Sequence, residues 1–241
     1  MKLKSLFSLL FVIVFSTFAF SQSVVITPKK VTYKRPKPIS EYKKSFTVTY
    51  PKVKAATPAL SKKIETAISY EKNNNLDIKD EINDTQWLED ASYTVNHNKH
   101  NVLDITLTSE GSGAYPSTFN KTVVVNLKTG NRVKPMDVFT NLSGLAAMCK
   151  KAQQAEIKKA IIDIKKENPD EENPADLFKE SNFTVKNLDE FSVNDKGVTF
   201  IYDYGFPHVI LALQPDGQYF FTWAQLKPFI KRGGLLEQFV S

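Results

Sequence analysis

A series of short segments in which apolar and polar residues alternate, joined by polar turns, limits the folds that this chain can adopt. Phe46, Val48 and Tyr50 alternate with polar neighbours, as in a strand that buries one face. Segments 87–95 and 102–107 are rich in aromatic and β-branched residues, and the polar residues 96–101 between them indicate a hairpin tip. Strands joined by such short turns pair antiparallel. The pattern therefore predicts a sheet built mainly from antiparallel hairpins.

The same alternation returns in the second half of the chain. A strand over 119–127 is followed by the turn residues 128–131, and strands over 191–193 and 198–202 flank a turn that ends in glycine. Residues 209–213 form a further apolar run that a Pro-Asp-Gly turn ends, and we expect a strand there as well.

Three helices are expected between these strands. Thr57 and Pro58 supply an N-cap and a favoured first residue for a helix over 58–72. Apolar residues at helical spacing predict a long helix over 143–166 and a short one over 222–230. The expected fold class is α+β, with mainly antiparallel hairpins, one long helix and two shorter helices. A division of this fold into two small subdomains stays open.

The N-terminus carries the three parts of a secretory signal. A charged start is followed by an apolar run over 6–20, and small residues at Ala19 and Ser21 suit cleavage before Gln22. The alternative is a retained membrane helix, which needs about 20 apolar residues and so more than this run offers. We expect a secreted or periplasmic protein with no membrane-spanning segment after cleavage. The expected divisions are a signal peptide (1–21), a basic proline-containing linker (22–43), a folded domain (44–232, with subdomains of about 44–110 and 111–232) and a tail (233–241).

Charge and cysteine content narrow the partners. The net charge of +6 falls to +4 once the two signal-peptide lysines are removed. Only three basic residues are arginines, the residue that nucleic-acid readers favour for bidentate contacts, so no nucleic-acid partner is expected. A basic arm over 29–44 that contacts anionic polymers stays open as one alternative. Cys149 is the single cysteine, so no intramolecular disulfide can form, and we expect a buried thiol.

Signatures of catalysis are weak. His97 and His100 stand three apart in a polar turn, without a cysteine or acid at a known ligand spacing. Ser112 lies between two glycines but lacks the Gly-x-Ser-x-Gly elbow, and no phosphate loop or dinucleotide fingerprint is present. We therefore assign no catalytic residue, no metal and no cofactor.

Two aromatic, polar loops offer the best candidate ligand contacts. One spans 111–117 and the other 202–208, each between predicted strands. Aromatic rings on glycine- and proline-shaped loops can stack on sugar rings or anchor a protein partner. The alternative is that these aromatics only cap the ends of the core. The candidate residues are Tyr115, Pro116, Tyr202, Asp203, Tyr204 and His208.

Several motifs also resemble a known family. They are the glycine-rich loop 111–116, the strand and turn 123–130 that end in Asn-Leu-Lys-Thr-Gly, the Asp-Val-Phe at 137–139 and the Asp-Lys-Gly-Val-Thr-Phe at 195–200. Over about 44–232 the chain resembles the exported domain of unknown function that forms the extracellular part of the RsiV anti-sigma factor and precedes the catalytic part of the peptidoglycan deacetylase PdaC. Tyr115 stands where that family commonly has a histidine.

The resemblance implies a two-part α+β domain at the cell envelope. In RsiV this domain receives lysozyme, and in PdaC it is accessory to wall chemistry. The expected function is therefore a non-enzymatic binding module whose partner is an envelope protein of the lysozyme kind or a peptidoglycan fragment. The alternative is a glycan-active hydrolase or transferase that uses an unidentified carboxylate pair.

Overall fold

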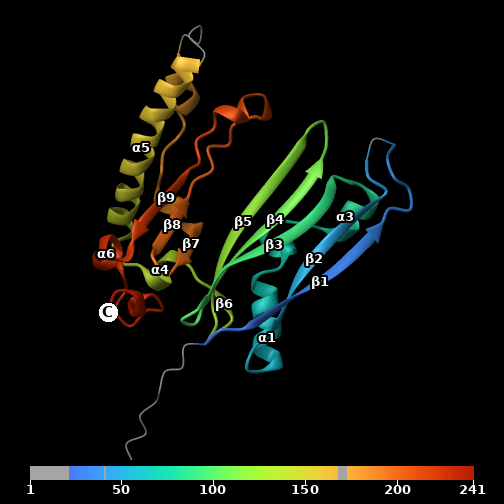
Figure 1. Ribbon diagram of the computed structural model, residues 1–241, viewed down its shortest axis with the longest axis horizontal. Helices are drawn as coiled ribbons and strands as arrows, with labels where there is room; N and C mark the ends of the chain where they lie inside the picture. The colour runs from blue at the N-terminus through green and yellow to red at the C-terminus, as the bar shows by residue number, and fades with distance from the viewer. Residues whose placement is uncertain (1–21, 41, 168–172) are drawn as a thin grey trace, which may run out of the picture.

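The chain folds around two β-sheets. The computed structural model describes residues 22–40, 42–167 and 173–241, so the predicted signal peptide lies outside the described residues. A six-stranded sheet has the strand order β1-β2-β3-β4-β5-β6, and a three-stranded sheet has the order β7-β8-β9 (Figure 1). The predicted α+β class is confirmed.

The first sheet is built almost entirely from antiparallel pairs, as predicted. Its strands are β1 (Val25–Lys34), β2 (Ser45–Lys54), β3 (Leu88–Lys99), β4 (Val102–Ser112), β5 (Pro116–Asn126) and β6 (Asn131–Arg132). The exception is a short parallel pairing of β2 with β3 through Thr47 and Val48. Parallel strands need a crossover connection. Here the crossover holds α1 (Pro58–Ala67), α2 (Tyr70–Asn73) and α3 (Ile78–Asn83), which cover one face of the sheet (Figure 1).

The second half of the chain surrounds the small sheet. Its elements are α4 (Pro135–Val138), α5 (Leu142–Glu167), η1 (Pro174–Phe178), η2 (Val185–Asp189), β7 (Phe191–Asn194), β8 (Gly197–Ile201), η3 (His208–Leu213), β9 (Gln218–Thr222), α6 (Trp223–Leu226), η4 (Lys227–Phe229) and η5 (Glu237–Phe239), the η elements being 3₁₀ helices. The long helix α5 packs beside this sheet, and its Leu145 and Cys149 are fully buried in the core there.

Two hydrophobic cores follow from this arrangement. One lies between the six-stranded sheet and α1, and Phe46, Ile64 and Ile105 are among its buried residues. The other joins α5, the small sheet and the C-terminal segment, and it includes Val102 and Val124 from the ends of β4 and β5. The sheet therefore buries one face along its length, and its other face only at the end where the second half packs.

The segment predicted to be a linker instead contains an edge strand. β1 pairs with β2 in antiparallel register over ten residues, from Val25 opposite Lys54 to Lys34 opposite Ser45. Its residues are mostly exposed and include Pro28 and several lysines. Proline and lysine are typical of edge strands, because a solvent-facing edge needs no further donors and lysine discourages pairing with another chain. This composition also resembles that of a linker, which is why the prediction was wrong.

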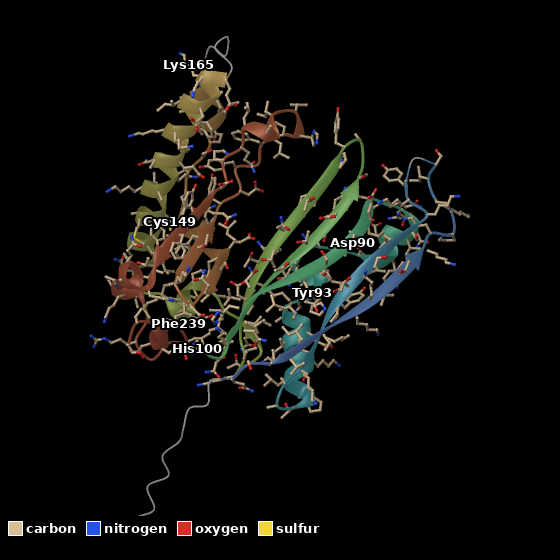
Figure 2. All side chains as sticks on the ribbon, in the orientation of Figure 1. Asp90, Tyr93, His100, Cys149, Lys165 and Phe239 are labelled. Atoms are coloured by element: carbon tan, nitrogen blue, oxygen red, sulfur yellow. The ribbon has the colours of Figure 1, made fainter. Side chains whose placement is uncertain are left out.

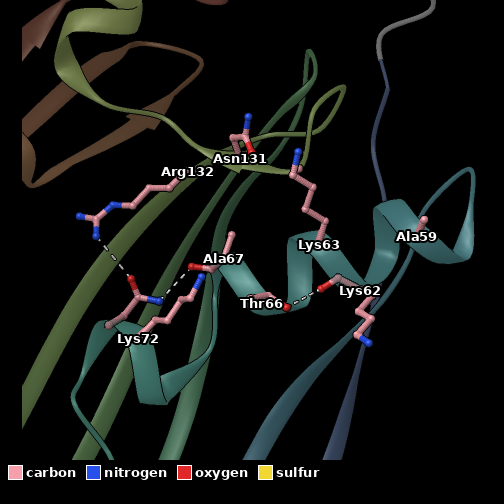
Figure 3. Close-up of a pocket in the computed structure, with 10 residues that line it drawn as sticks. Ala59, Lys62, Lys63, Thr66, Ala67, Lys72, Asn131 and Arg132 are labelled. Carbon is pink, nitrogen blue, oxygen red and sulfur yellow. Dashed lines mark hydrogen bonds between the residues drawn. The ribbon is translucent and has the colours of Figure 1, made fainter.

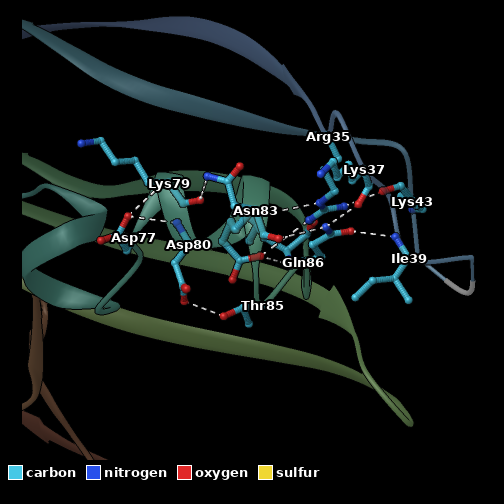
Figure 4. Close-up of polar contacts among 12 residues, drawn as sticks. Arg35, Lys37, Ile39, Lys43, Asp77, Lys79, Asp80, Asn83, Thr85 and Gln86 are labelled. Carbon is cyan, nitrogen blue, oxygen red and sulfur yellow. Dashed lines mark hydrogen bonds and ion pairs between the residues drawn. The ribbon is translucent and has the colours of Figure 1, made fainter.

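A buried arginine anchors the end of this strand. The Arg35 guanidinium donates hydrogen bonds to the carbonyls of Glu81, Lys43 and Leu88 at 3.0, 2.6 and 2.7 Å (Figure 4). It lies 4.9 Å from the centroid of the Phe46 ring and 3.6 Å from a Glu81 carboxylate oxygen. These contacts tie the segment after β1 to α3 and to the start of β3.

Several boundaries differ from those predicted by local pattern. The helix predicted over 58–72 ends at Ala67, and Ser69 is extended before α2 begins. The hairpin tip predicted over 96–101 narrows to two residues of positive φ, His100 and Asn101, because the strands run longer. β4 and β5 pair across the boundary suggested at 110/111, so the first sheet continues to β6.

The C-terminal segments show the largest differences. The strand predicted over 209–213 is the 3₁₀ helix η3, whose Val209 is 81% exposed and whose residues pair with no strand among those described. β9 was not predicted, and the helix expected over 222–230 is the shorter α6 followed by η4. The expected tail is packed, since Leu236 is buried and the Phe239 ring stacks on Trp223 at 4.5 Å.

Candidate ligand-binding site

The structure brings together one residue from each predicted aromatic loop. The rings of Tyr115 and His208 stack with centroids 4.4 Å apart and planes inclined by 15°. Tyr115 lies in the turn between β4 and β5, and His208 begins η3, two segments that lie at the same end of the molecule (Figure 1). Both residues are exposed, Tyr115 by 56%. The pair is therefore a solvent-facing aromatic contact between the two halves of the chain.

Short-range hydrogen bonds shape the loop that carries His208. The Asp203 carboxylate accepts a hydrogen bond from the Gly205 amide at 2.8 Å, and Gly205 has a φ of +66° that suits glycine. The Phe206 amide donates to the Gln214 side chain at 2.9 Å. Asp203 itself is exposed, so its carboxylate is open to solvent in the same loop that carries His208.

Tyr202 and Tyr204 lie in the core side of the same loop. The Tyr202 hydroxyl accepts from the Asn182 amide at 3.1 Å, and the Tyr204 hydroxyl donates to a Glu156 carboxylate oxygen at 2.8 Å. Tyr219 donates to the same oxygen at 2.9 Å. Burial is the main cause that raises the pKa of both Tyr204 and Tyr219 above the ordinary value for tyrosine. For these two loop tyrosines the structure favours the alternative in which aromatics close the end of the core.

The other loop stands on a tryptophan. Gly111 lies against Trp87, where an added Cβ would come within 2.3 Å of the Trp87 carbonyl oxygen. The indole N–H donates to the Ser117 hydroxyl at 3.1 Å. Pro116 is exposed at the first position of β5, opposite Ser112. The close contact between Gly111 and the indole supports the tip of the hairpin that presents Tyr115.

Next to the aromatic pair, the six-stranded sheet has a polar face. Side chains that alternate with the core residues are linked across strands: Thr106 with Thr122 at 3.1 Å, and Thr108 with Asn120 at 2.8 Å. Other members of this face, which we call the polar sheet face, are Thr32, Thr47, Asp90, Ser92, Thr94, Asn96, Glu110 and Thr118. Its members near the hairpin tip are exposed, so hydroxyl, amide and carboxylate groups point to solvent.

The polar sheet face also carries two acids in register. Asp90 of β3 and Glu110 of β4 are direct partners across the antiparallel pair. Each alternates with buried neighbours such as Ala91 and Ser109, so both side chains project from the same face. Residues in such positions have Cβ atoms roughly 4.5–5.5 Å apart. Figure 2 places Asp90 on the sheet, away from the second half of the chain.

The polar sheet face was not predicted from the sequence. Its signal lies in runs such as 105–108, where threonine alternates with Ile105 and Leu107. Strict alternation predicts one buried and one exposed face, but it does not show that the exposed sides of five strands adjoin. Only the strand order makes one surface of them.

The two neighbouring histidines lie at the opposite end of the sheet. The rings of His97 and His100 are 6.3 Å apart, and both contact Phe239, which lies beside His100 in Figure 2. His97 is buried, and burial lowers its pKa below the ordinary histidine value although Asp195 acts in the other direction. Among the described residues, no group of three or more His, Cys, Asp or Glu side chains is placed to hold a metal ion.

Cys149 lies in the second core, as expected. The thiol is fully buried on α5, and burial raises its pKa to about 12. A thiol is nucleophilic only as the thiolate, so at neutral pH this group is inert in the folded protein.

None of the helices in the part of the chain that the structure describes is long and apolar enough to cross a bilayer.

Comparison with known proteins finds similarity in structure alone. The chain resembles a DUF3298 family protein from Pseudomonas aeruginosa, with a TM-score of 0.56 and 14% identity over 87% of this chain and 95% of that one. It resembles a DUF3298 family member from Bacteroides fragilis with a TM-score of 0.54 and 14% identity, over 90% and 98%. No family model and no curated protein matches the sequence. The shared fold is that of a domain of unknown function.

Proposed function

We propose that the chain is an exported, non-enzymatic binding module of the cell envelope, and a divergent relative of the DUF3298 proteins whose fold it shares. Its ligand is a wall glycan that packs on the Tyr115–His208 pair and hydrogen-bonds to the polar sheet face. Export rests on the N-terminal signal pattern, and the glycan on the chemistry of the site. The observation that carries the proposal is the exposed stack of Tyr115 on His208.

Sugars present both apolar ring faces and many hydroxyl groups. The apolar ring faces can pack on the outer faces of an aromatic pair, and the hydroxyl groups can hydrogen-bond to threonine, asparagine and carboxylate side chains. Tyr115 and His208 belong to different halves of the chain, so a ligand that packs on both also joins the halves. Thr118 and Asn120 are exposed on the strand that leaves the Tyr115 turn, within the same surface.

The test is the binding of residues 22–241 to soluble peptidoglycan fragments, measured by isothermal titration calorimetry. We expect Tyr115→Ala and His208→Ala each to weaken binding about tenfold, or about 1.4 kcal/mol, with unchanged melting temperature. Phe220→Ala is the matched control, because Phe220 is also an exposed aromatic but lies on β9.

The result that contradicts the proposal is equal affinity in the wild type and in both site variants. Lysozyme is titrated in parallel. Saturable binding of lysozyme that depends on Tyr115, without binding of the fragments, would assign the same surface to a protein partner instead of a glycan.

A second function is favoured by the in-register pair Asp90 and Glu110. A retaining glycosidase uses two carboxylates about 5 Å apart, one as nucleophile and the other as acid and base, and residues directly opposed on neighbouring strands have their Cβ atoms about that far apart. This hydrolase predicts release of reducing ends from peptidoglycan, and its loss in both Asp90→Asn and Glu110→Gln. A binding module releases no reducing ends, so an assay of reducing-end release separates the two functions.

A further inference from the structure

A second surface, remote from the aromatic pair, has the properties of an anion site. A pocket of about 530 Å³ lies between α1, the end of α2 and the β5–β6 turn. Four of its lining residues are basic: Lys62, Lys63, Lys72 and Arg132. Thr66, Asn73 and Asn131 add hydroxyl and amide groups, and none of the described residues that line the pocket carries a carboxylate.

The lysines around this pocket are not neutralised by the protein. Within the described ranges, Lys62, Lys63 and Lys72 form no ion pair with an acid. Glu65, the acid on the same helix, is instead bound to Lys52 and to the Val53 amide on the β2 side. Like charges gathered without counterions raise the free energy of the fold, and a bound anion relieves that repulsion.

Arg132 is held in place at the edge of the pocket. One terminal nitrogen of its guanidinium lies 3.5 Å from the Asn73 side-chain oxygen, and the other lies 3.4 Å from the Asp189 carbonyl. Figure 3 shows Lys63, Lys72 and Arg132 around the same space, whereas Lys62 points to the other side of α1. A guanidinium that is positioned beforehand loses less freedom when it binds a phosphate in its fork.

The turn that completes the pocket is seated directly on α1. Gly130 has a φ of +71°, and an added Cβ would come 3.1 Å from Leu60 and from Lys63. This close approach brings Asn131 and Arg132 over the helix that supplies Lys63. The basic residues therefore come from three separate elements that tertiary packing brings together.

An apolar pocket adjoins the basic one, because Arg132 lines both. This second pocket, of about 430 Å³, is lined by Val133, Pro135, Met136, Leu142 and Val185 together with Lys134, Lys186 and Asp189. Met136 is 62% exposed and Val185 is 43% exposed. A phosphate group in the basic pocket thus has room beside it for an attached apolar group.

We propose that the basic pocket between α1, α2 and the β5–β6 turn binds a phosphate group. Lys63 and Lys72 supply charge, Arg132 supplies the bidentate fork, and the neighbouring amide and hydroxyl groups accept or donate the remaining hydrogen bonds. The phosphate can come from a free anion or from the head group of a lipid, and the adjoining apolar pocket distinguishes these sources. This site is independent of the proposed glycan surface.

The experiment titrates residues 22–241 with inorganic phosphate and with dihexanoyl phosphatidic acid, followed by calorimetry and amide NMR shifts. We expect saturable binding of phosphate with shifts at Lys63, Lys72, Asn131 and Arg132. The double variant Lys63→Ala/Lys72→Ala is expected to weaken it at least about tenfold. The matched control is Lys158→Ala, an exposed lysine on α5, which should leave binding unchanged.

The two sources give different affinities. A lipid head group predicts that phosphatidic acid binds at least about tenfold more tightly than phosphate, and that Met136→Ser removes this gain. Equal affinities would assign the site to a free anion, and both results support a phosphate site. Absence of saturable binding, or an equal loss in Lys158→Ala, would overturn the proposal, because nonspecific attraction then explains the charge cluster.

Discussion

Asp104 is a buried residue at the joint between the two halves of the chain. It is fully buried on β4, and its carboxylate accepts three hydrogen bonds. One oxygen accepts from the Ser192 hydroxyl at 2.5 Å and the Val193 amide at 2.6 Å, and the other from the Asn96 side chain at 3.0 Å. Ser192 and Val193 belong to β7, so these bonds tie the six-stranded sheet to the small sheet. We predict that Asp104→Ala destabilises the fold.

The magnitude follows from two opposing contributions. Each hydrogen bond to a charged acceptor contributes about 1.5–3 kcal/mol, whereas burying the carboxylate costs several kcal/mol. The second contribution is substantial, because burial raises the pKa of Asp104 even though all three hydrogen bonds lower it. Alanine removes the buried charge but leaves the Val193 amide without an acceptor, which costs about 1–3 kcal/mol. With the lost packing we expect a net loss of about 3 kcal/mol.

The assay is equilibrium unfolding in guanidinium chloride, followed by tryptophan fluorescence. Trp87 lies in the first half of the chain and Trp223 in the second, so Trp87→Phe and Trp223→Phe backgrounds report on each half. Asp195→Ala is the matched control, because Asp195 also meets the other half through Lys99 but is exposed. It should leave the midpoint unchanged.

Asp104→Asn keeps a single acceptor oxygen. Its loss of stability should therefore fall between that of Asp104→Ala and that of the control Asp195→Ala. The prediction is wrong if Asp104→Ala lowers the free energy of unfolding by less than about 1 kcal/mol, or if Asp195→Ala lowers it by as much as Asp104→Ala does. Either result would mean that the joint relies on apolar contacts and not on this buried carboxylate.

Three further predictions concern pH, a buried arginine and the thiol. The folded-state pKa of Asp104 is raised above its ordinary 3.8, so the stability of wild type relative to Asp104→Asn should increase as pH falls through the raised value toward 3.8; a flat difference in unfolding free energy contradicts this. Arg35→Lys should cost about 2 kcal/mol in the same assay, because the single nitrogen of lysine cannot take the places of the three guanidinium nitrogens that bond to three separate carbonyls, while the exposed control Arg232→Lys costs none. Cys149 should react with a thiol reagent at least about 100-fold more slowly in the folded than in the unfolded protein, and fast labelling of the native state would show that it is accessible.

Local patterns predicted the elements that carry their own signals. Period-two alternation and enrichment in aromatic and β-branched residues located β2, β3, β4, β5, β7 and β8, and apolar spacing located α5 to within about a residue at each end. Turn residues marked the hairpin at Asn194–Gly197, where the Asn194 side chain accepts from the amides of Lys196 and Gly197. These signals work because strand alternation, caps and turns depend on neighbours within a few residues.

Elements that depend on distant partners could not be predicted this way. The sequence of β1 resembles that of a linker, and the segment is a strand because it pairs with β2. β9 is a strand because it pairs with the edge of β8. Residues 209–213 are apolar enough for a strand but pair with none of those described, so they form η3. Edge pairing decides these cases, and no window of local sequence contains it.

The same distinction between local signals and distant contacts applies to the candidate site. The chemical groups follow from the sequence: two aromatic, glycine-shaped loops, alternating threonines on several strands and a surplus of lysine. Which of these groups meet depends on the tertiary fold. It stacked Tyr115 on His208, turned Tyr204 inward to Glu156 and brought Arg132 to Lys63. The physical reason is that strand order and the packing of the two halves set these distances, and both arise from burial of apolar surface contributed by the whole chain.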